Sequence, residues 1–265
     1  MEIIHHTPAT PVSAVLFDFD GTISTLRFGW DAVMRQMMLE LIPNRQTPDA
    51  QLTTRVDAYL DESAGIQTIY QMKWLAEQVQ AFGATPNARS DPWLYKDDYN
   101  ERLMRLVKKR IEQVASGEVP AEQYLVGGAR ALLSVLKARG IPCYVASGTD
   151  DCDVRREAHV LGVDDFFERI AGAPLRAEGC AKEAALRGLI ADSGLRGADI
   201  AVIGDGKVEI ALAKSIGARA LGLASDEAVR HGVNPLKRTR LMRAGADAIT
   251  GDYLETDAWM AWLGL

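Results

Sequence analysis

The sequence predicts an α/β protein: a Rossmann-like parallel sheet with helices on both faces, plus an inserted all-helical cap domain. A buried strand near the N-terminus ends in two aspartates, and strands and helices alternate through the second half of the chain. Such alternation is typical of a parallel sheet. The stretch between these parts contains no β-rich run and is too long for a single crossover helix. We therefore expect a core of residues 1–24 and 125–265 and a helical cap of residues 25–124.

The first strand carries the most informative residues. Val12–Thr22 reads Val-Ser-Ala-Val-Leu-Phe-Asp-Phe-Asp-Gly-Thr, and its consecutive apolar residues predict a central strand buried on both faces. Alternate residues point the same way, so Asp18 and Asp20 would project together beyond the carboxyl end of the strand. Open α/β sheets bind ligands at that edge, and two adjacent carboxylates need a compensating cation, proton or hydrogen bonds. The alternative, an Asp-Gly surface turn, does not explain the buried strand.

The inserted segment has helical periodicity over Asp31–Leu41, Ile66–Phe82 and Asp97–Val114, and it contains most of the Trp and Tyr residues. Hinges of a separate cap would fall near Ser24–Phe28 and Val119–Val126. The alternative is a helical subdomain packed rigidly on the sheet.

The second half of the chain is expected to alternate regularly between strands and helices, and glycines occur where helix C-caps belong. The expected strands are Pro142–Ala146, Ile200–Ile203, Arg219–Leu223 and Ala246–Ile249. The expected helices are Gly127–Arg139, Asp151–Leu161, Lys182–Ser193 and Val208–Ile216.

Polar residues follow two of these strands. Ser147-Gly148-Thr149 would hold an anion such as phosphate if it formed a turn at a helix N-terminus, although an ordinary N-cap is an alternative. Asp205 and Glu209, in Gly-Asp-Gly-Lys-Val-Glu, could share a face of the first helical turn and hold a divalent cation. For Glu209, a helix N-terminus enriched in acids explains the residue almost as well.

Lys182 lies at the start of a predicted helix, where the helix dipole disfavours a positive charge. The position therefore predicts a negatively charged partner. A surface lysine is the alternative.

Composition limits the function. The net charge of −6 argues against nucleic-acid binding, and the basic clusters Lys108–Arg110 and Lys237–Arg240 are interpreted as solvated helix faces. The three cysteines lack metal-ligand spacing, the N-terminus lacks the pattern of a signal peptide, and no apolar run has the length of a membrane span. We expect a cytoplasmic protein with reduced thiols and no nucleic-acid or membrane partner.

Taken together, the motifs resemble those of the haloacid dehalogenase superfamily, whose members are mostly phosphatases. The resemblance is carried by Asp18-Phe19-Asp20-Gly21-Thr22, Ser147, Lys182, and Gly204-Asp205 with Glu209. It covers residues 12–24 and about 125–265, and the intervening helices resemble a C1-type cap.

The resemblance implies a Mg²⁺-dependent phosphatase that hydrolyses a small phosphorylated metabolite through an aspartyl-phosphate. Asp20 favours phosphate-ester chemistry over dehalogenation, because relatives of the dehalogenase kind generally lack an acid there. A sugar phosphomutase of the β-phosphoglucomutase type is the alternative. A non-catalytic binding module is disfavoured by the intact acids.

The resemblance also assigns roles. Asp18 would be the nucleophile, and Asp20 the general acid and base whose backbone carbonyl also binds the metal. Mg²⁺ would lie between Asp18 and Asp205, with Glu209 acting through a water or by orienting Asp205. The phosphate oxygens would be neutralised by Ser147, the Gly148 amide and Lys182.

Substrate specificity is expected in the cap. Arg27, Trp30, Lys73 and Trp74 are candidates to contact the leaving group, although the two tryptophans could instead fill the core of the cap. The physiological substrate, its pathway and the oligomeric state stay open.

Overall fold

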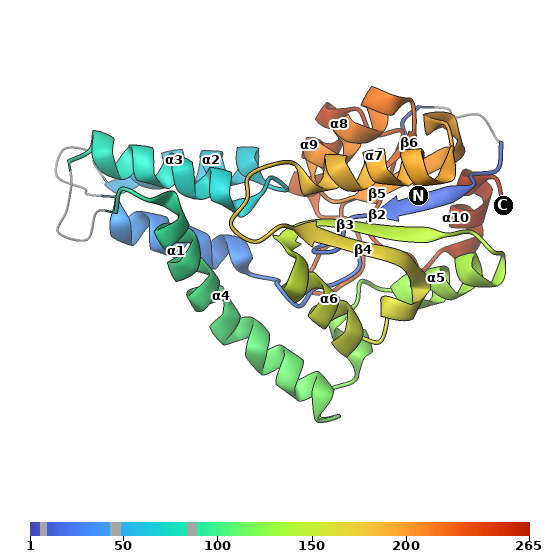
Figure 1. Cartoon of the computed structure of the whole chain (residues 1–265), viewed down its shortest axis with the longest axis horizontal. Coiled ribbons are helices and arrows are strands. Elements are labelled where there is room, and N and C mark those ends of the chain that lie inside the picture. Colours follow the sequence, from blue (N-terminus) through green and yellow to red (C-terminus); the bar gives the residue numbers. More distant parts are fainter. Residues whose placement is uncertain (6–9, 43–48, 84–88) are drawn as a thin grey trace.

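A seven-stranded sheet forms the centre of the computed structural model, which describes residues 1–5, 10–42, 49–83 and 89–265 (Figure 1). The strand order is β1-β7-β6-β5-β2-β3-β4, and β1 is antiparallel to β7 whereas the other neighbours are parallel. The strands are β1 (Glu2–Ile3), β2 (Ala14–Phe17), β3 (Cys143–Asp150), β4 (Phe167–Ala173), β5 (Ile200–Gly204), β6 (Arg219–Leu223) and β7 (Ala248–Thr250). The predicted Rossmann-like sheet is confirmed.

Helices cover both faces of the sheet, as predicted. Along β2, Phe17 packs into one apolar cluster with α5, α6 and α10, while Leu16 packs into another with α7, α8 and α9. This alternation gives a central strand its continuous apolar sequence. The helices are α5 (Ala129–Ala138), α6 (Asp151–Val160), α7 (Ala181–Ser193), α8 (Lys207–Ile216), α9 (Pro235–Ala244) and α10 (Thr256–Leu263).

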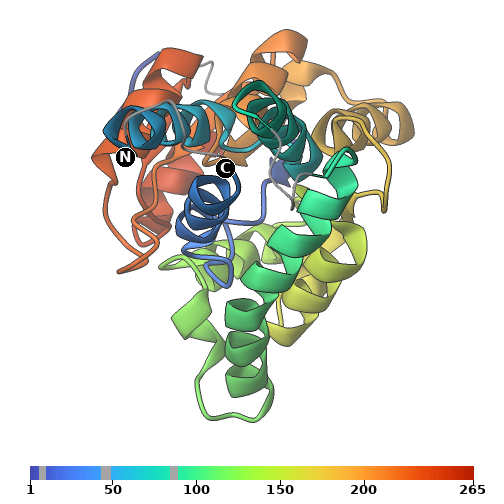
Figure 2. The same cartoon turned by 90° about the vertical axis from the view of Figure 1, so that its left-hand side faces the viewer.

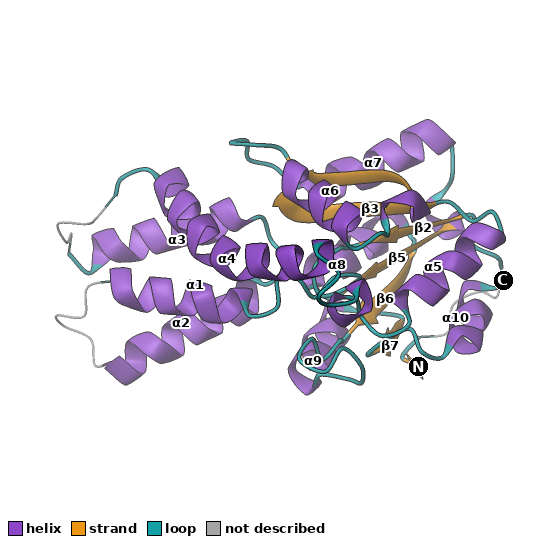
Figure 3. Ribbon diagram, turned by 90° about the horizontal axis from the view of Figure 1, so that it is seen from below, coloured by secondary structure: helices purple, strands orange, loops and turns teal. Residues whose placement is uncertain are grey.

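A bundle of four helices lies beyond the carboxyl ends of the strands (Figures 1 and 3). It is inserted between β2 and the 3₁₀ turn η1 (Ala121–Tyr124) and has an apolar core of its own. Figure 2 views the molecule from the bundle side. The four helices are α1 (Trp30–Leu41), α2 (Asp49–Ser63), α3 (Thr68–Ala81) and α4 (Pro92–Ala115).

The two chain segments that join the bundle to the core run side by side. Ser24 bridges Leu125 in an antiparallel manner and Asp20 in a parallel manner. The predicted hinge segments therefore meet next to a candidate site residue. The exact domain boundaries stay a prediction.

Some elements were missed by the sequence analysis. These are β1, β4, α2 and α10. The strand β4 carries Glu168 and Arg169 and lies at the edge of the sheet, where one side chain in two can stay polar, so its sequence lacks the apolar run of a central strand. In α2 the apolar stripe is weak and most residues are polar. Among the described helices, none is both long and apolar enough to cross a membrane.

Candidate active site

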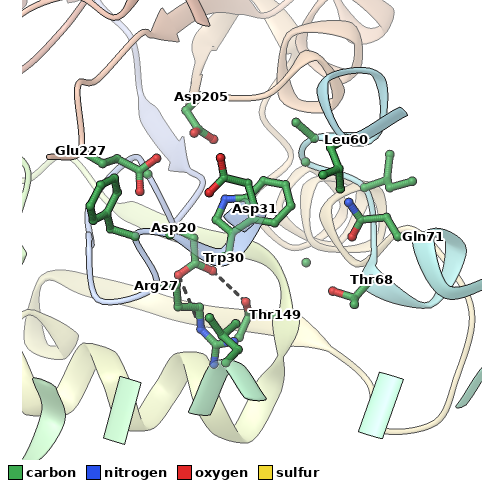
Figure 4. Close-up of a pocket in the computed structure, with 18 of the residues that line it drawn as sticks. Asp20, Arg27, Trp30, Asp31, Leu60, Thr68, Gln71, Thr149, Asp205 and Glu227 are labelled. Atoms are coloured by element: carbon green, nitrogen blue, oxygen red, sulfur yellow. Dashed lines mark hydrogen bonds and ion pairs between the residues drawn. The ribbon is translucent and has the colours of Figure 1, made fainter. Parts of the chain in front are cut away.

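A cavity of about 530 Å³ lies between the carboxyl edge of the sheet and the helical bundle. Figure 4 shows its polar lining. On the sheet side it is lined by Asp18, Asp20, Ser147, Gly148, Lys182 and Asp205. The structure therefore brings together, at one edge, six of the residues that the sequence analysis selected.

Asp18 is the most enclosed of the three aspartates Asp18, Asp20 and Asp205. Its side chain is 5% exposed, and its Oδ1 accepts a hydrogen bond of 2.8 Å from the Phe19 amide. Its Oδ2 lies 2.9 Å from Nζ of Lys182, which also donates to Glu209. Lys182, in the first turn of α7, thus has the negatively charged partners that its position predicts, and it is not a surface lysine.

Burial and neighbouring charges shift the pKa values of Asp18 and Lys182. It raises the pKa of the Asp18 carboxyl well above its ordinary value, and the charges of Glu209 and Asp205 raise it further, while Lys182 opposes them. Burial alone would lower the pKa of Lys182, but Asp18 and Glu209 more than reverse that effect, so its pKa is raised. Lys182 is therefore a permanent cation beside Asp18.

Asp20 has a different set of partners. Its Oδ2 accepts hydrogen bonds from Thr149 Oγ1 at 2.8 Å and from Ser147 Oγ at 3.4 Å. Its Oδ1 lies 3.8 Å from Nε of Arg27 and is buried with no hydrogen-bond partner among the described residues (Figure 4). Asp20 is thus held by hydrogen bonds through one oxygen, while its other oxygen faces Arg27.

The segment Ser147-Gly148-Thr149 does not form the expected turn at a helix N-terminus. It continues the extended strand β3, and α6 begins only at Asp151. Ser147 Oγ accepts from the Thr149 amide at 3.0 Å, so it does not cap the helix either. The expectation of a helix N-terminus was wrong. Ser147 and Gly148 nevertheless line the cavity, because the carboxyl end of β3 reaches the same edge as that of β2.

Asp205 follows β5 and pairs with a lysine that sequence reasoning missed. Lys237 Nζ lies 2.6 Å from Asp205 Oδ2, 2.6 Å from Glu227 Oε1 and 3.3 Å from Ser225 Oγ. Its side chain is buried, so the interpretation of Lys237 as part of a solvated helix face was wrong. The local signal was Asn234-Pro235: the Asn234 side chain caps α9, and this fixes Lys237 in the first turn of that helix.

The oxygen ligands at this edge suit a hard divalent cation. Among the described residues, no group of three or more His, Cys, Asp or Glu side chains gathers as a metal site. Mg²⁺ does not require one, because it is commonly held by one or two carboxylates, waters and substrate phosphate. Gly21 has φ +70°, and a Cβ there would collide with Oδ2 of Asp205, so glycine alone lets that carboxylate approach. Asp18 and Asp205 therefore fit the proposed ion.

Glu209 is placed differently from the expectation of a metal ligand. Its Oε1 pairs with Lys182, while Oε2 is buried without a hydrogen-bond partner in the described part of the chain. Gly204 and Gly206 leave the room for this side chain, since a Cβ at Gly204 would collide with its Cγ. This contact indicates that Glu209 orients Lys182.

The predicted specificity residues lie apart from one another. Arg27 lines the cavity, but its guanidinium is bound to Glu157, with the closest contact at 2.6 Å, and to Asp153 at 3.3 Å. Lys73 does not line the cavity and pairs with Glu178 at 2.6 Å. These placements do not support a direct contact of either residue with a leaving group.

The two tryptophans also differ. Trp30 lines the cavity, whereas Trp74 stacks on Tyr59 with ring centroids 3.9 Å apart. Both pack at the margin of the apolar core of the bundle. Trp30 is therefore the one aromatic of this pair that can meet a ligand.

The turn between α2 and α3 covers the site. Gln67 Nε2 donates to the Ala177 carbonyl at 2.8 Å, and its Oε1 accepts from the Gly179 amide at 3.2 Å. A Cβ on Gly65 would lie 3.4 Å from Cα of Gly206. The bundle thus touches the loops after β4 and β5 and covers part of the cavity.

Comparison with known proteins agrees with this geometry. The sequence matches the family described as "Hydrolase: haloacid dehalogenase-like hydrolase" over residues 12–217. No curated protein matches the chain.

Several solved structures share the fold. A predicted phosphatase from Clostridium acetobutylicum has a TM-score of 0.63 at 18% identity and covers 95% of this chain and 99% of its own. A predicted phosphoglycolate phosphatase from Haemophilus somnus 129PT has a TM-score of 0.60 at 18% identity, with coverage of 95% and 99%. A β-phosphoglucomutase from Clostridium difficile has a TM-score of 0.63 at 14% identity, with coverage of 95% and 97%.

Proposed function

Because the chain belongs to the haloacid dehalogenase-like hydrolase family, we propose that it is a Mg²⁺-dependent phosphatase that hydrolyses a small phosphate monoester through an aspartyl-phosphate. One observation carries the proposal. The Asp18 carboxylate lies at the end of the central strand, bound to Lys182 and open to the cavity. A carboxylate held beside a permanent cation is suited to attack a phosphorus atom whose oxygens that cation also neutralises.

Two carboxyl groups take different parts in the proposed reaction. An Asp18 oxygen forms a bond to phosphorus as the bond from phosphorus to the alcohol oxygen breaks, and protonated Asp20 gives its proton to that leaving oxygen. A water then attacks the phosphorus of the acyl phosphate and gives a proton to Asp20, while the bond from phosphorus to the Asp18 oxygen breaks. The products are the alcohol and inorganic phosphate, and both carboxyls return to their starting states. The Oδ1 of Asp20, which is buried and has no hydrogen-bond partner among the described residues, supports this role.

The phosphate oxygens would face donors from two elements. Ser147 and the Gly148 amide from β3 and Lys182 from α7 would neutralise the charge on the transferring group. Glu209 holds the ammonium of Lys182 in place. Arg27, bound to Glu157, lies beside Asp20 and limits the positions that this carboxylate can adopt.

Mg²⁺ would be held by the carboxylates of Asp18 and Asp205 and by the backbone carbonyl of Asp20. When bound, the ion supplies positive charge next to the phosphoryl group and so favours attack by an anion. Lys237 must share Asp205 with this ion, since its ammonium lies on Oδ2.

The helical bundle serves as the cap in this proposal, with residues 25–124 closing over residues 1–24 and 125–265. The contacts of Gln67 with the loop after β4 support it, because they join the bundle to the core beside the cavity. We place the activity in the cytoplasm on the sequence argument from the three cysteines.

A sugar phosphomutase is the second candidate. It is favoured by a β-phosphoglucomutase neighbour that superimposes as well as a phosphatase does. The same residues would then pass the phosphoryl group back to the sugar rather than to water.

Phosphate release from p-nitrophenyl phosphate tests the proposal. We expect release that needs Mg²⁺ and is abolished by EDTA and by Asp18→Asn, while the exposed-site control Asp257→Asn retains it. Beryllium fluoride with Mg²⁺ should form an acyl-phosphate mimic on wild type but not on Asp18→Asn. Neither turnover nor this adduct on folded, Mg²⁺-loaded protein would overturn the proposal. Isomer interconversion primed by a sugar bisphosphate, with little phosphate release, would favour the mutase.

A further inference from the structure

The cationic side chains of the cavity already have anionic partners. Within the described residues, every arginine and lysine that lines the cavity lies within 3.3 Å of a carboxylate oxygen. The pairs are Arg27–Glu157, Arg35–Asp57, Lys96–Asp150, Lys182–Asp18, Lys237–Glu227 and Arg240–Asp61. Apart from Lys182, which serves the phosphate, no lining cation is left over for a second anionic group.

The anionic side chains, in contrast, exceed the cations. Asp31, in the first turn of α1, and Asp226, in the loop after β6, line the same cavity and pair with no cation among the described residues. Figure 4 shows Asp31 among the polar groups that surround the cavity. Asp31 is exposed and Asp226 is partly buried, so water screens part of this surplus charge, but it still gives the cavity a negative potential.

This potential selects against an anionic leaving group. A carboxylate or a second phosphate there would either face Asp31 and Asp226 without compensation or displace a carboxylate from one of the ion pairs. The displaced carboxylate would then be left unpaired inside the cavity, which costs free energy. An uncharged leaving group meets neither difficulty.

The remaining lining suits hydroxyl groups. The pairs Arg35–Asp57 and Lys96–Asp150 each present a donor next to an acceptor, and Asn100, Thr68 and Gln71 add further polar atoms. A hydroxyl both donates and accepts, so several hydroxyls in a row match such a surface. Trp30 offers an apolar surface for the C–H face of the same molecule. The volume of about 530 Å³ is that of a site for a small organic molecule.

We propose that the substrate is the phosphate monoester of an uncharged polyhydroxy alcohol, a sugar or sugar alcohol, and that Asp31 helps to reject esters whose leaving group carries a further acid. This inference rests on the proposed phosphatase function and specifies its substrate class.

Two matched substrates test it. Glucitol 6-phosphate and 6-phosphogluconate share a six-carbon chain and differ at the far end, where one has a hydroxymethyl group and the other a carboxylate. We expect kcat/KM to be at least about tenfold higher for glucitol 6-phosphate, because like charges brought together cost several kcal/mol. Glycerol 3-phosphate against 3-phosphoglycerate repeats the comparison on a shorter chain. Equal or reversed preference in both pairs would overturn the proposal.

Asp31→Asn tests the named residue. It should raise kcat/KM for 6-phosphogluconate several-fold while changing the value for glucitol 6-phosphate much less. Glu101→Gln, which removes an exposed charge from the bundle outside the cavity, should leave the ratio unchanged. The role of Asp31 is overturned if Asp31→Asn has a wild-type melting temperature and leaves the ratio of the two kcat/KM values unaltered.

The two proposals fail in different ways. Loss of all Mg²⁺-dependent hydrolysis of p-nitrophenyl phosphate contradicts the phosphatase function itself. If p-nitrophenyl phosphate is hydrolysed and kcat/KM is the same for 6-phosphogluconate and glucitol 6-phosphate, only the inferred substrate class is wrong.

Discussion

Lys182→Met isolates the charge balance at the centre of the site. Lys182 is buried and neutralises two carboxylates, one on Asp18 and one on Glu209. Methionine has a similar length and no charge, so the substitution removes the ammonium without leaving a large cavity. Both carboxylates then remain buried without a cationic partner.

The cost follows from this burial. Removal of one partner from a buried ion pair destabilises a protein by about 3–5 kcal/mol, because the other charge is left uncompensated. Oε2 of Glu209 already lacks a hydrogen-bond partner in the described chain, so it offers no alternative contact. We therefore expect Lys182→Met to lose at least about 3 kcal/mol of unfolding free energy at neutral pH.

Urea unfolding in the presence of EDTA measures this loss, with the exposed-site variant Lys109→Met as control. Adding Glu209→Gln to Lys182→Met should restore part of the stability, since one of the two uncompensated charges is gone. Burial raises the pKa of the Asp18 carboxyl above its ordinary value, and loss of Lys182 removes the charge that opposes this shift. The variant should therefore regain stability as the pH falls and lose it as the pH rises.

Two results would refute this reasoning. One is a loss below about 1 kcal/mol for Lys182→Met, which is the size typical of an exposed pair. The other is a double variant no more stable than Lys182→Met alone.

Two further predictions concern the neighbouring groups. Lys237→Met frees Oδ2 of Asp205 from an ammonium 2.6 Å away, so calorimetry should show Mg²⁺ binding about tenfold more tightly, and weaker binding would contradict the competition. Burial raises the pKa of Glu157 to about 7 in the folded chain, with Arg27 opposing, so wild type loses stability relative to Glu157→Gln as the pH rises from about 4.5 to 7. A difference in melting temperature between the two proteins that stays constant over this range contradicts the shift.

The site residues on the sheet were accessible to sequence reasoning for a topological reason. Parallel strands end at the same edge, so residues that follow β2, β3 and β5 must converge whatever the helices do. Asp18, Ser147 and Asp205 each follow an apolar run that marks such a strand. Lys182 was found from its unfavourable place at a helix N-terminus, which required a charged partner.

The roles of residues whose long side chains reach partners remote in the sequence could not be predicted in this way. Helical periodicity indicates which face of α9 carries Lys237, but only the packing of α9 against β6 shows that this face meets Asp205. Lys73 lies on α3 and Arg27 on a predicted hinge, and both pair with core carboxylates that are remote in sequence. Such pairings depend on the tertiary structure. Nothing in the local sequence could therefore test the expectation that these side chains face the substrate.

Each of the two aspartates whose carboxylates we assign to the metal shares a lysine with a glutamate, which gives two similar sets of charges. Asp18 shares Lys182 with Glu209, and Asp205 shares Lys237 with Glu227. When all are ionised, four carboxylates and two ammonium groups leave a charge of −2 across the two sets, the amount that one divalent cation would balance. Each lysine thus lowers the cost of enclosing its aspartate without removing the negative charge that attracts the ion. This arrangement would allow a site with so many acids to lie under the bundle and still attract the proposed Mg²⁺.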